Sequence, residues 1–127
     1  MREKKERVID AVNATKAAIE EGIVAGGEIA LYTFSAFAEG ILNKALKAPF
    51  KKLLENSGLD YAEVLQSMGN KKYPYGVDVI DGQIKDLLKA GIIDPVKVVK
   101  SALSNAVSAS INLMTTDCLV TDVEEKK

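Results

Sequence analysis

Two adjacent glycines, Gly26 and Gly27, stand just before a run of helical periodicity that begins near Glu28. Free backbone N–H groups at the start of a helix, together with the positive end of its dipole, favour a phosphate or another anion. A flexible joint between two helices explains the same glycines, and spacing alone favours that simpler explanation. The pair is therefore a candidate anion site with an ordinary structural alternative.

Two aspartates, Asp94 and Asp10, are candidate functional residues, and each also has an ordinary structural explanation. Asp94 precedes Pro95 at the start of a long apolar repeat, so its carboxylate is predicted to cap a central helix over residues 94–116, with Pro95 in the first turn. The capped end is expected to face a loop suited to binding. Asp10 lies on the polar side of a helix predicted over residues 7–21, where a solvated charge needs no further function.

Composition excludes several other kinds of site. The 127 residues include 17 basic and 18 acidic side chains, a balance that offers no basic surface to nucleic acid. There is no histidine and one cysteine, Cys118, which excludes an internal disulfide and leaves a metal without its usual ligands. No apolar run is long enough to cross a membrane, and the charged opening does not resemble a signal peptide. We expect a cytoplasmic protein without a metal site.

The helices that position these residues follow from the apolar spacing. Besides the first helix and the central helix, one is expected over residues 28–54, interrupted at Gly40 and kinked or restarted at Pro49. A shorter helix should follow Asp60, whose side chain is a suitable N-cap. The chain length suits a single domain with one core.

The remaining segments predict a small amount of β-structure. Residues 69–76 are rich in turn formers, and residues 77–79 alternate like a short strand that we expect to pair with residues 92–93 in a hairpin. A short helix is predicted over residues 84–88, and a last strand over residues 118–121. The predicted fold class is mainly α, with a small β-hairpin and a short C-terminal strand.

Longer segments carry a more specific signal. They include Arg-Val-Ile-Asp-Ala from residue 7, Glu-Glu-Gly-Ile-Val-Ala-Gly-Gly from residue 20, and Ala-Gly-Ile-Ile-Asp-Pro-Val-Lys-Val from residue 90. Ser-Ala-Leu-Ser-Asn-Ala follows from residue 101, and Thr-Thr-Asp-Cys-Leu-Val-Thr-Asp from residue 115. In order and content, these segments closely resemble the C-terminal part of GroEL-type (group I) chaperonins.

The resemblance implies a division of the chain. Residues 1–22 resemble the helix at the C-terminal end of the intermediate domain, and residues 23–127 resemble the C-terminal half of the equatorial, ATP-binding domain. It also implies a chaperonin equatorial-like helical layer. The apical domain and the N-terminal half of the equatorial domain have no counterpart here, and the link between Ala38 and Ile41 is short for the family.

The resemblance also implies a nucleotide site. In the family, the glycine turn lies against the nucleotide, a loop surrounds the adenine, one aspartate approaches the ribose, and another orients the water that attacks ATP. The matching residues are Gly26 and Gly27 for the turn, Asp78, Val79 and Ile80 for the loop, Asp94 for the ribose and Asp10 for catalysis. Glu28 departs from the family, which usually has a third glycine at that position.

The functional expectation is a fragment of an ATP-dependent chaperonin that assists protein folding in a double ring. ATP and Mg²⁺ are cofactors of the intact family protein, and its partners are unfolded polypeptide and a co-chaperonin. The family's phosphate loop and Mg²⁺-binding aspartate lie in the half that has no counterpart here, so this chain alone is expected neither to bind nucleotide tightly nor to hydrolyse ATP.

The alternative is a free-standing helical module for oligomerisation or interaction, without catalysis. Small residues on several sides of the central helix predict more neighbours than one chain supplies. We therefore expect a homo-oligomer whose interface uses helix faces containing Phe34, Phe37, Val99 and Leu103. Neither nucleic acid nor a membrane is an expected partner.

Overall fold

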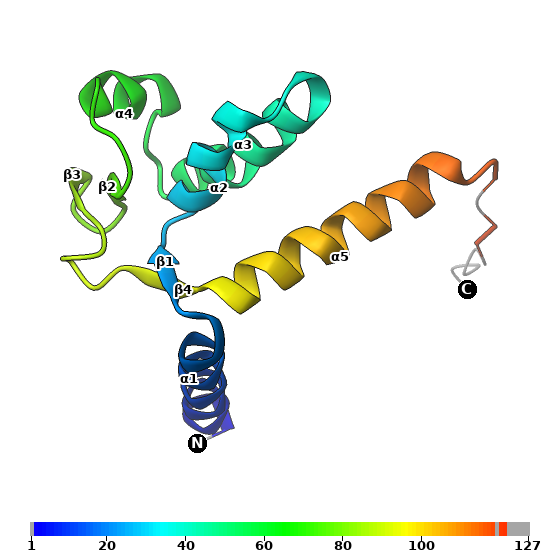
Figure 1. Cartoon of the computed structure of the whole chain (residues 1–127), viewed down its shortest axis with the longest axis horizontal. Coiled ribbons are helices and arrows are strands. Elements are labelled where there is room, and N and C mark those ends of the chain that lie inside the picture. The colour runs from blue at the N-terminus through cyan, green and yellow to red at the C-terminus, as the bar shows by residue number, and fades with distance from the viewer. Residues whose placement is uncertain (1, 119, 122–127) are drawn as a thin grey trace, which may run out of the picture.

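The computed structural model describes residues 2–118, 120 and 121 (Figure 1). Helices predominate, which confirms the predicted fold class, and the strands are short and antiparallel. In chain order the elements are α1 (Arg2–Glu21), β1 (Ile23–Ala25), α2 (Ile29–Phe34), the 3₁₀ helix η1 (Ser35–Phe37), α3 (Gly40–Asn56), α4 (Tyr61–Met68), β2 (Tyr75–Asp78), β3 (Gln83–Asp86), β4 (Ile93–Pro95) and α5 (Val96–Thr115).

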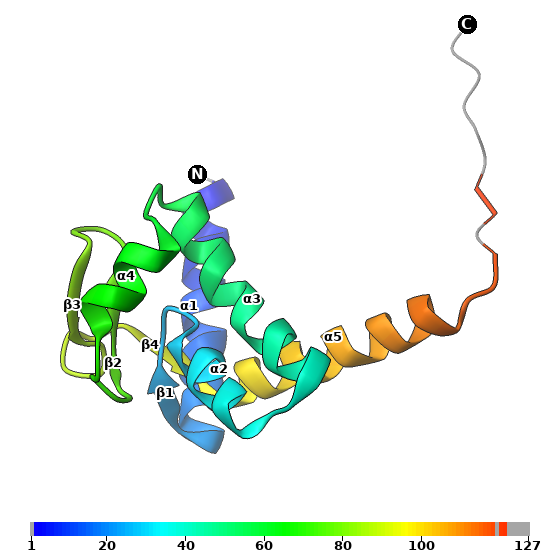
Figure 2. The same cartoon turned by 90° about the horizontal axis from the view of Figure 1, so that it is seen from above.

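A two-stranded ladder joins the two ends of a compact lobe. Strands β1 and β4 are antiparallel, with Val24 opposite Asp94 and Ala25 opposite Ile93. The lobe, made of α2, α3, α4 and the hairpin β2–β3, lies on one side of this ladder, while α1 and α5 leave it in different directions (Figures 1 and 2). The ladder is therefore the neck of the lobe.

The core of the lobe lies between its helices and its hairpin. Aromatic rings organise it, because Phe50 contacts Tyr32 at 5.0 Å and Tyr61 at 6.3 Å between ring centroids. The predicted cap of α4 is confirmed: the Asp60 carboxylate accepts hydrogen bonds from the N–H groups of Ala62 and Glu63. The buried residues of this core are Ala25, Ile29, Phe50, Leu54, Val64, Met68, Val77 and Leu87.

The hairpin has a different partner from the one predicted. Val77 pairs with Ile84 in β3, whereas Ile93 pairs in β1–β4, so the expected pairing of residues 77–79 with residues 92–93 is wrong. The helix predicted over residues 84–88 is also wrong, because its first residues form β3. Local turn chemistry explains both results: the Asp81 carboxylate accepts from the Gln83 N–H at 3.0 Å and starts β3 directly opposite β2.

The central helix begins later than predicted. Asp94 belongs to β4, and the cap position of α5 is occupied by Pro95, which provides no side-chain hydrogen bond. The Val96 N–H instead donates to the Gly22 carbonyl at 3.1 Å, so the neck satisfies the first amide of α5. The predicted Asp94 cap is therefore wrong, because strand pairing takes up this residue.

Three smaller expectations also changed. The predicted interruption near Gly40 falls at residues 38–39, before α3 begins, and α3 then continues through Pro49 without restarting. Cys118, Val120 and Thr121 form no strand, and Leu119 lies outside the described residues.

None of the helices that the structure describes has the length and apolar character needed to cross a membrane.

Candidate functional site

The predicted glycine turn and the predicted ribose-binding aspartate meet at the neck. Gly26 follows β1 directly, and its N–H donates to the Ile92 carbonyl at 2.9 Å. A Cβ atom on Gly26 would lie only 3.3 Å from the Asp94 Oδ2 atom and 3.3 Å from the Ile92 backbone. A larger residue would therefore be tightly packed at this position, and Asp94 lies directly against the turn.

Gly27 connects the same turn to the hairpin. Its backbone has a φ of +63°, a conformation that favours glycine. A Cβ there would lie 3.7 Å from the Leu87 side chain and 3.9 Å from the Val77 carbonyl oxygen. The structure thus brings the end of β2, just before Asp78, close to the glycine turn.

Glu28 makes the site more acidic than the resemblance alone implies. It occupies the cap position of α2 in a left-handed conformation, φ 60° and ψ 6°, and makes no capping hydrogen bond. Burial, and then the nearby Asp94 carboxylate, raise the pKa of Glu28, while burial raises the pKa of Asp94. Two half-buried carboxyl groups beside Gly26 oppose a phosphate, and α2 is too short to offset them with a strong dipole.

The three residues of the loop expected around adenine have different surroundings. The Asp78 carboxylate accepts from the Ile80 N–H at 3.0 Å and from Lys85 Nζ at 2.8 Å, and Lys85 holds the pKa of Asp78 below its usual value. Val79 packs partly against the core, whereas Ile80 is 92% exposed. The loop therefore offers an apolar surface beside a carboxylate that is already paired with a lysine, and this lysine also pairs with Asp81.

Asp10 is not brought to this site. It lies on the exposed surface of α1, and the rise of a helix places it about 16 Å along the axis from Glu21 at the end of α1. Helix α1 lies on the side of the ladder opposite the lobe (Figure 1). The predicted catalytic role of Asp10 remains a prediction, and it requires a movement of α1 relative to the neck.

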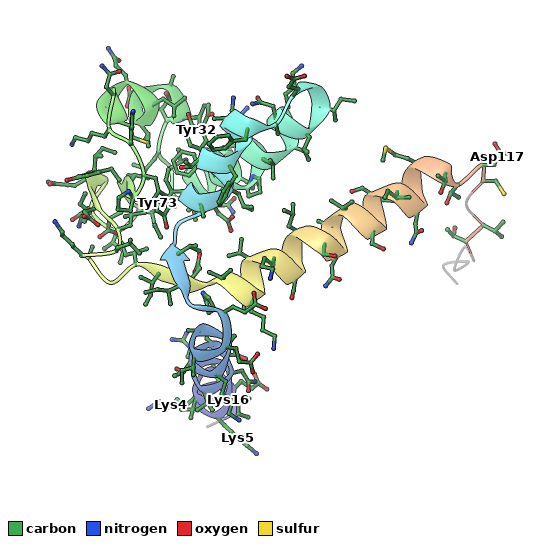
Figure 3. The ribbon with its side chains drawn as sticks, viewed as in Figure 1. Lys4, Lys5, Lys16, Tyr32, Tyr73 and Asp117 are labelled. Carbon is green, nitrogen blue, oxygen red and sulfur yellow. The ribbon has the colours of Figure 1, made fainter. Side chains whose placement is uncertain are left out.

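Sequence analysis missed one residue that supports the glycine turn. The Ala25 N–H, on the side of β1 not paired with β4, donates to the Tyr73 hydroxyl at 2.9 Å. Figure 3 shows Tyr73 beside the strand. The turn-rich sequence around Tyr73 explained that segment sufficiently, and no local pattern links it to a strand far away in the sequence.

Ion pairs also fix the two helices below the neck. Lys100 Nζ lies 2.7 Å from the Glu21 carboxylate, and Lys97 pairs with Glu20, so α1 and α5 are joined where both leave the ladder. Within residues 2–118, 120 and 121, no group of three or more His, Cys, Asp or Glu side chains is placed to hold a metal ion.

Comparisons with known proteins agree with this arrangement. The sequence model of the TCP-1/cpn60 chaperonin family matches residues 1–124. A crystal structure of a group III chaperonin in the open state superposes with a TM-score of 0.63 at 25% sequence identity, over 82% of this chain and 25% of that chain. The present chain thus spans about a quarter of that protein's length. These matches do not single out group I, but they agree on the family: the chain belongs to the TCP-1/cpn60 chaperonin family.

Proposed function

We propose that this chain provides the C-terminal half of the nucleotide-binding equatorial domain of an ATP-dependent, GroEL-type chaperonin. Residues 1–22 would then be the connecting helix from the intermediate domain. The observation that carries the proposal is the contact between Gly26 and Asp94, because two residues matched separately to the family's nucleotide site meet across the β1–β4 ladder. In this proposal the complete protein works in the cytoplasm as a double-ring homo-oligomer, with unfolded polypeptide and a co-chaperonin as partners.

The residues fit one side of a nucleotide better than the other. Asp94 is a suitable acceptor for a ribose hydroxyl, and Val79 and Ile80 offer apolar surface for a base. On the phosphate side, the carboxyl group of Glu28 works against binding. ATP with Mg²⁺ would supply the phosphoryl chemistry in the complete protein, whereas this chain alone should bind nucleotide weakly and hydrolyse none.

A nuclear magnetic resonance titration tests the proposed site. Adding ATP to the ¹⁵N-labelled chain should shift the amide signals of Gly26, Gly27, Ile80 and Asp94, even at millimolar affinity. Adenosine should reproduce the shift at Ile80, and inorganic phosphate should produce little change at the two glycines. ATP-induced shifts confined to other parts of the chain, or none at all, would refute the site.

Turnover is measured separately. The isolated chain should release no ADP above background, with or without Mg²⁺. Hydrolysis that is lost in Asp10→Ala, but kept in a control such as Asn13→Ala on the same helix, would contradict the proposed inactivity. That result would mean that α1 reaches the nucleotide without the rest of the family's domain.

A second candidate function is a free-standing helical interaction module. One observation favours it specifically: α5 contains no buried residue, although many of its side chains are apolar. A helix of this kind gains stability when another surface covers it. This candidate requires no nucleotide.

A further inference from the structure

The loop that joins β2 to β3 is built on two aspartate turns. A hydrogen bond from the Gly82 N–H to the Asp78 carbonyl, at 2.8 Å, closes the loop. At its start the Asp78 Oδ1 atom accepts from the Ile80 N–H at 3.0 Å. At its end the Asp81 Oδ1 atom accepts from the Gln83 N–H at 3.0 Å. Each turn fixes the backbone locally, but neither turn joins one aspartate to the other.

Lys85 provides that connection. Its Nζ atom lies 2.8 Å from the Asp78 Oδ2 atom and 2.8 Å from the Asp81 Oδ2 atom. Each carboxylate therefore has one oxygen on the loop backbone and the other on the same ammonium group. In the ladder Asp78 is opposite Gln83, two residues before Lys85, so the lysine reaches Asp78 diagonally across the hairpin.

The ammonium group of Lys85 also lies between two like charges. Without it, the carboxylates of Asp78 and Asp81 would repel each other within one short loop. The Asp78 side chain is only 15% exposed and that of Lys85 33%, so water and salt screen this pair less than a fully exposed one. We therefore expect the loss of Lys85 to loosen the loop.

The loop held in this way carries the apolar surface assigned to the base. Val79 packs partly against the core, whereas the side chain of Ile80 is 92% exposed. A loop that keeps one shape before the ligand arrives avoids the entropy cost of being ordered on binding. The order of this loop should therefore affect the affinity for the base.

We propose that Lys85 is a positioning residue, which holds the loop from Asp78 to Gly82 in the conformation that receives the base of the nucleotide. Lys85 acts through the two aspartates, and no contact between Lys85 and the base is required. This inference rests on the proposed nucleotide site and deepens it, because it names the group that shapes the base-binding side.

Loop order is measured first, without nucleotide, by ¹⁵N relaxation. In Lys85→Met the order parameters of Val79 and Ile80 should fall from about 0.85 to below about 0.6. Lys85→Arg keeps a cation that can bind two carboxylates, and it should retain the order. Lys89→Met is the matched control, because Lys89 pairs with Asp86, outside the loop. Unchanged amide signals in the core helices show that each variant is folded, and Lys85→Gln repeats the test if Lys85→Met fails to fold.

A titration gives a second readout of the same contact. Lys85 is the largest cause of the lowered pKa of Asp78, and it lowers the pKa of Asp81 as well. Carboxyl ¹³C signals followed across the pH range should therefore show that both pKa values rise in Lys85→Met. Neither value should move in Lys89→Met.

Adenosine binding completes the test. At one fixed concentration of adenosine, the shift of the Ile80 amide signal should fall at least about threefold in Lys85→Met and change little in Lys85→Arg and Lys89→Met. Unchanged loop order in Lys85→Met, or a wild-type adenosine shift in that variant, would overturn the positioning role and leave the nucleotide site standing. If adenosine does not shift Ile80 in the wild-type chain, the nucleotide site itself fails, and the positioning role fails with it.

Discussion

The hydroxyl group of Tyr73 accepts a hydrogen bond from the buried Ala25 N–H at 2.9 Å, immediately before the glycine turn. One edge of β1 pairs with β4, and no strand pairs with the opposite edge. The bond to Tyr73 lies on that unpaired edge of β1. A side chain from a turn thereby serves as the second neighbour of a short strand.

Removing that hydroxyl should destabilise the neck. Tyr73→Phe leaves the buried Ala25 N–H without a partner, which should lower the free energy of unfolding by about 1–2 kcal/mol. Tyr75→Phe is the matched control, because its ring lies near Lys71 but its hydroxyl makes no hydrogen bond within the described residues. Urea denaturation of both variants measures the difference. Equal loss in the two variants would mean that the bond contributes no stability.

A second prediction concerns the contact between the hairpin and the core. A Cβ on Gly76 would lie 2.7 Å from Leu87 Cδ1, and Leu87 is fully buried. Gly76→Ala should therefore cost about 1–3 kcal/mol of stability through overpacking. In the double variant with Leu87→Val, the alanine should cost about 1 kcal/mol less, because the clashing methyl group has moved away. Simple additivity of the two losses would show that another contact, such as the Ile29 side chain at 3.3 Å, rather than Leu87, opposes the alanine.

The left-handed backbone at Glu28 gives a third prediction. Glu28 has a φ of 60° without any capping bond, a conformation that costs a non-glycine residue about 1 kcal/mol. Glu28→Gly should remove this cost and raise the free energy of unfolding by up to about 1 kcal/mol at neutral pH. Glu28→Gln keeps the strained backbone and removes only the charge. If glutamine stabilised the chain as much as glycine did, charge rather than backbone strain would be the cause.

The raised pKa of Asp94 predicts the direction in which the stability of the fold changes with pH. Burial raises the pKa of Asp94 in the folded chain, so the folded state holds this proton more tightly than the unfolded state. The extra stability that the protonated Asp94 side chain gives the fold is fully present below the ordinary carboxyl pKa, near 4. This stability is lost as pH rises through the raised pKa of Asp94. Asp94→Asn should therefore become increasingly more stable than the wild type as pH rises from about 4 to 7.

Asp78→Asn provides the opposite control for this pH dependence. Lys85 lowers the pKa of Asp78 in the folded chain, so Asp78 stabilises the fold above the ordinary carboxyl range and loses this effect as pH falls through the lowered value. Asp78→Asn should thus lose stability relative to the wild type as pH rises. Urea midpoints measured across the pH range distinguish the two trends, and parallel curves for the two variants would contradict both assignments.

Sequence patterns correctly predicted those features of the fold that are determined by residues close together in the sequence. The cap of α4 by Asp60 and the start of α2 beside Glu28 follow from residues within one helical turn, and both are found in the structure. The long apolar repeat likewise predicted α5, although not its first residue. These features needed no information about distant segments.

The errors arose where a distant segment decided the structure. A cap at Asp94 is locally favourable, but pairing with Val24 makes the residue part of a strand. The segment from Ile84 to Leu88 has helical spacing, yet its register with β2 and the buried position of Leu87 hold its first part extended. In the candidate site, family resemblance supplied the residues, whereas the support from Tyr73 became visible only in three dimensions.

The neck also determines how the molecule would respond to mechanical force. The chain enters the ladder at Ile23 and leaves it at Pro95, and these two residues are directly opposite each other. A force that separates α1 from α5 therefore acts on one residue pair of the ladder at a time, in unzipping geometry. It does not load all three residue pairs together in shear. The ion pairs of Lys97 and Lys100 with α1 lie just outside that first pair and would break before it. The fold is thus mechanically weak along the direction that joins its two long helices.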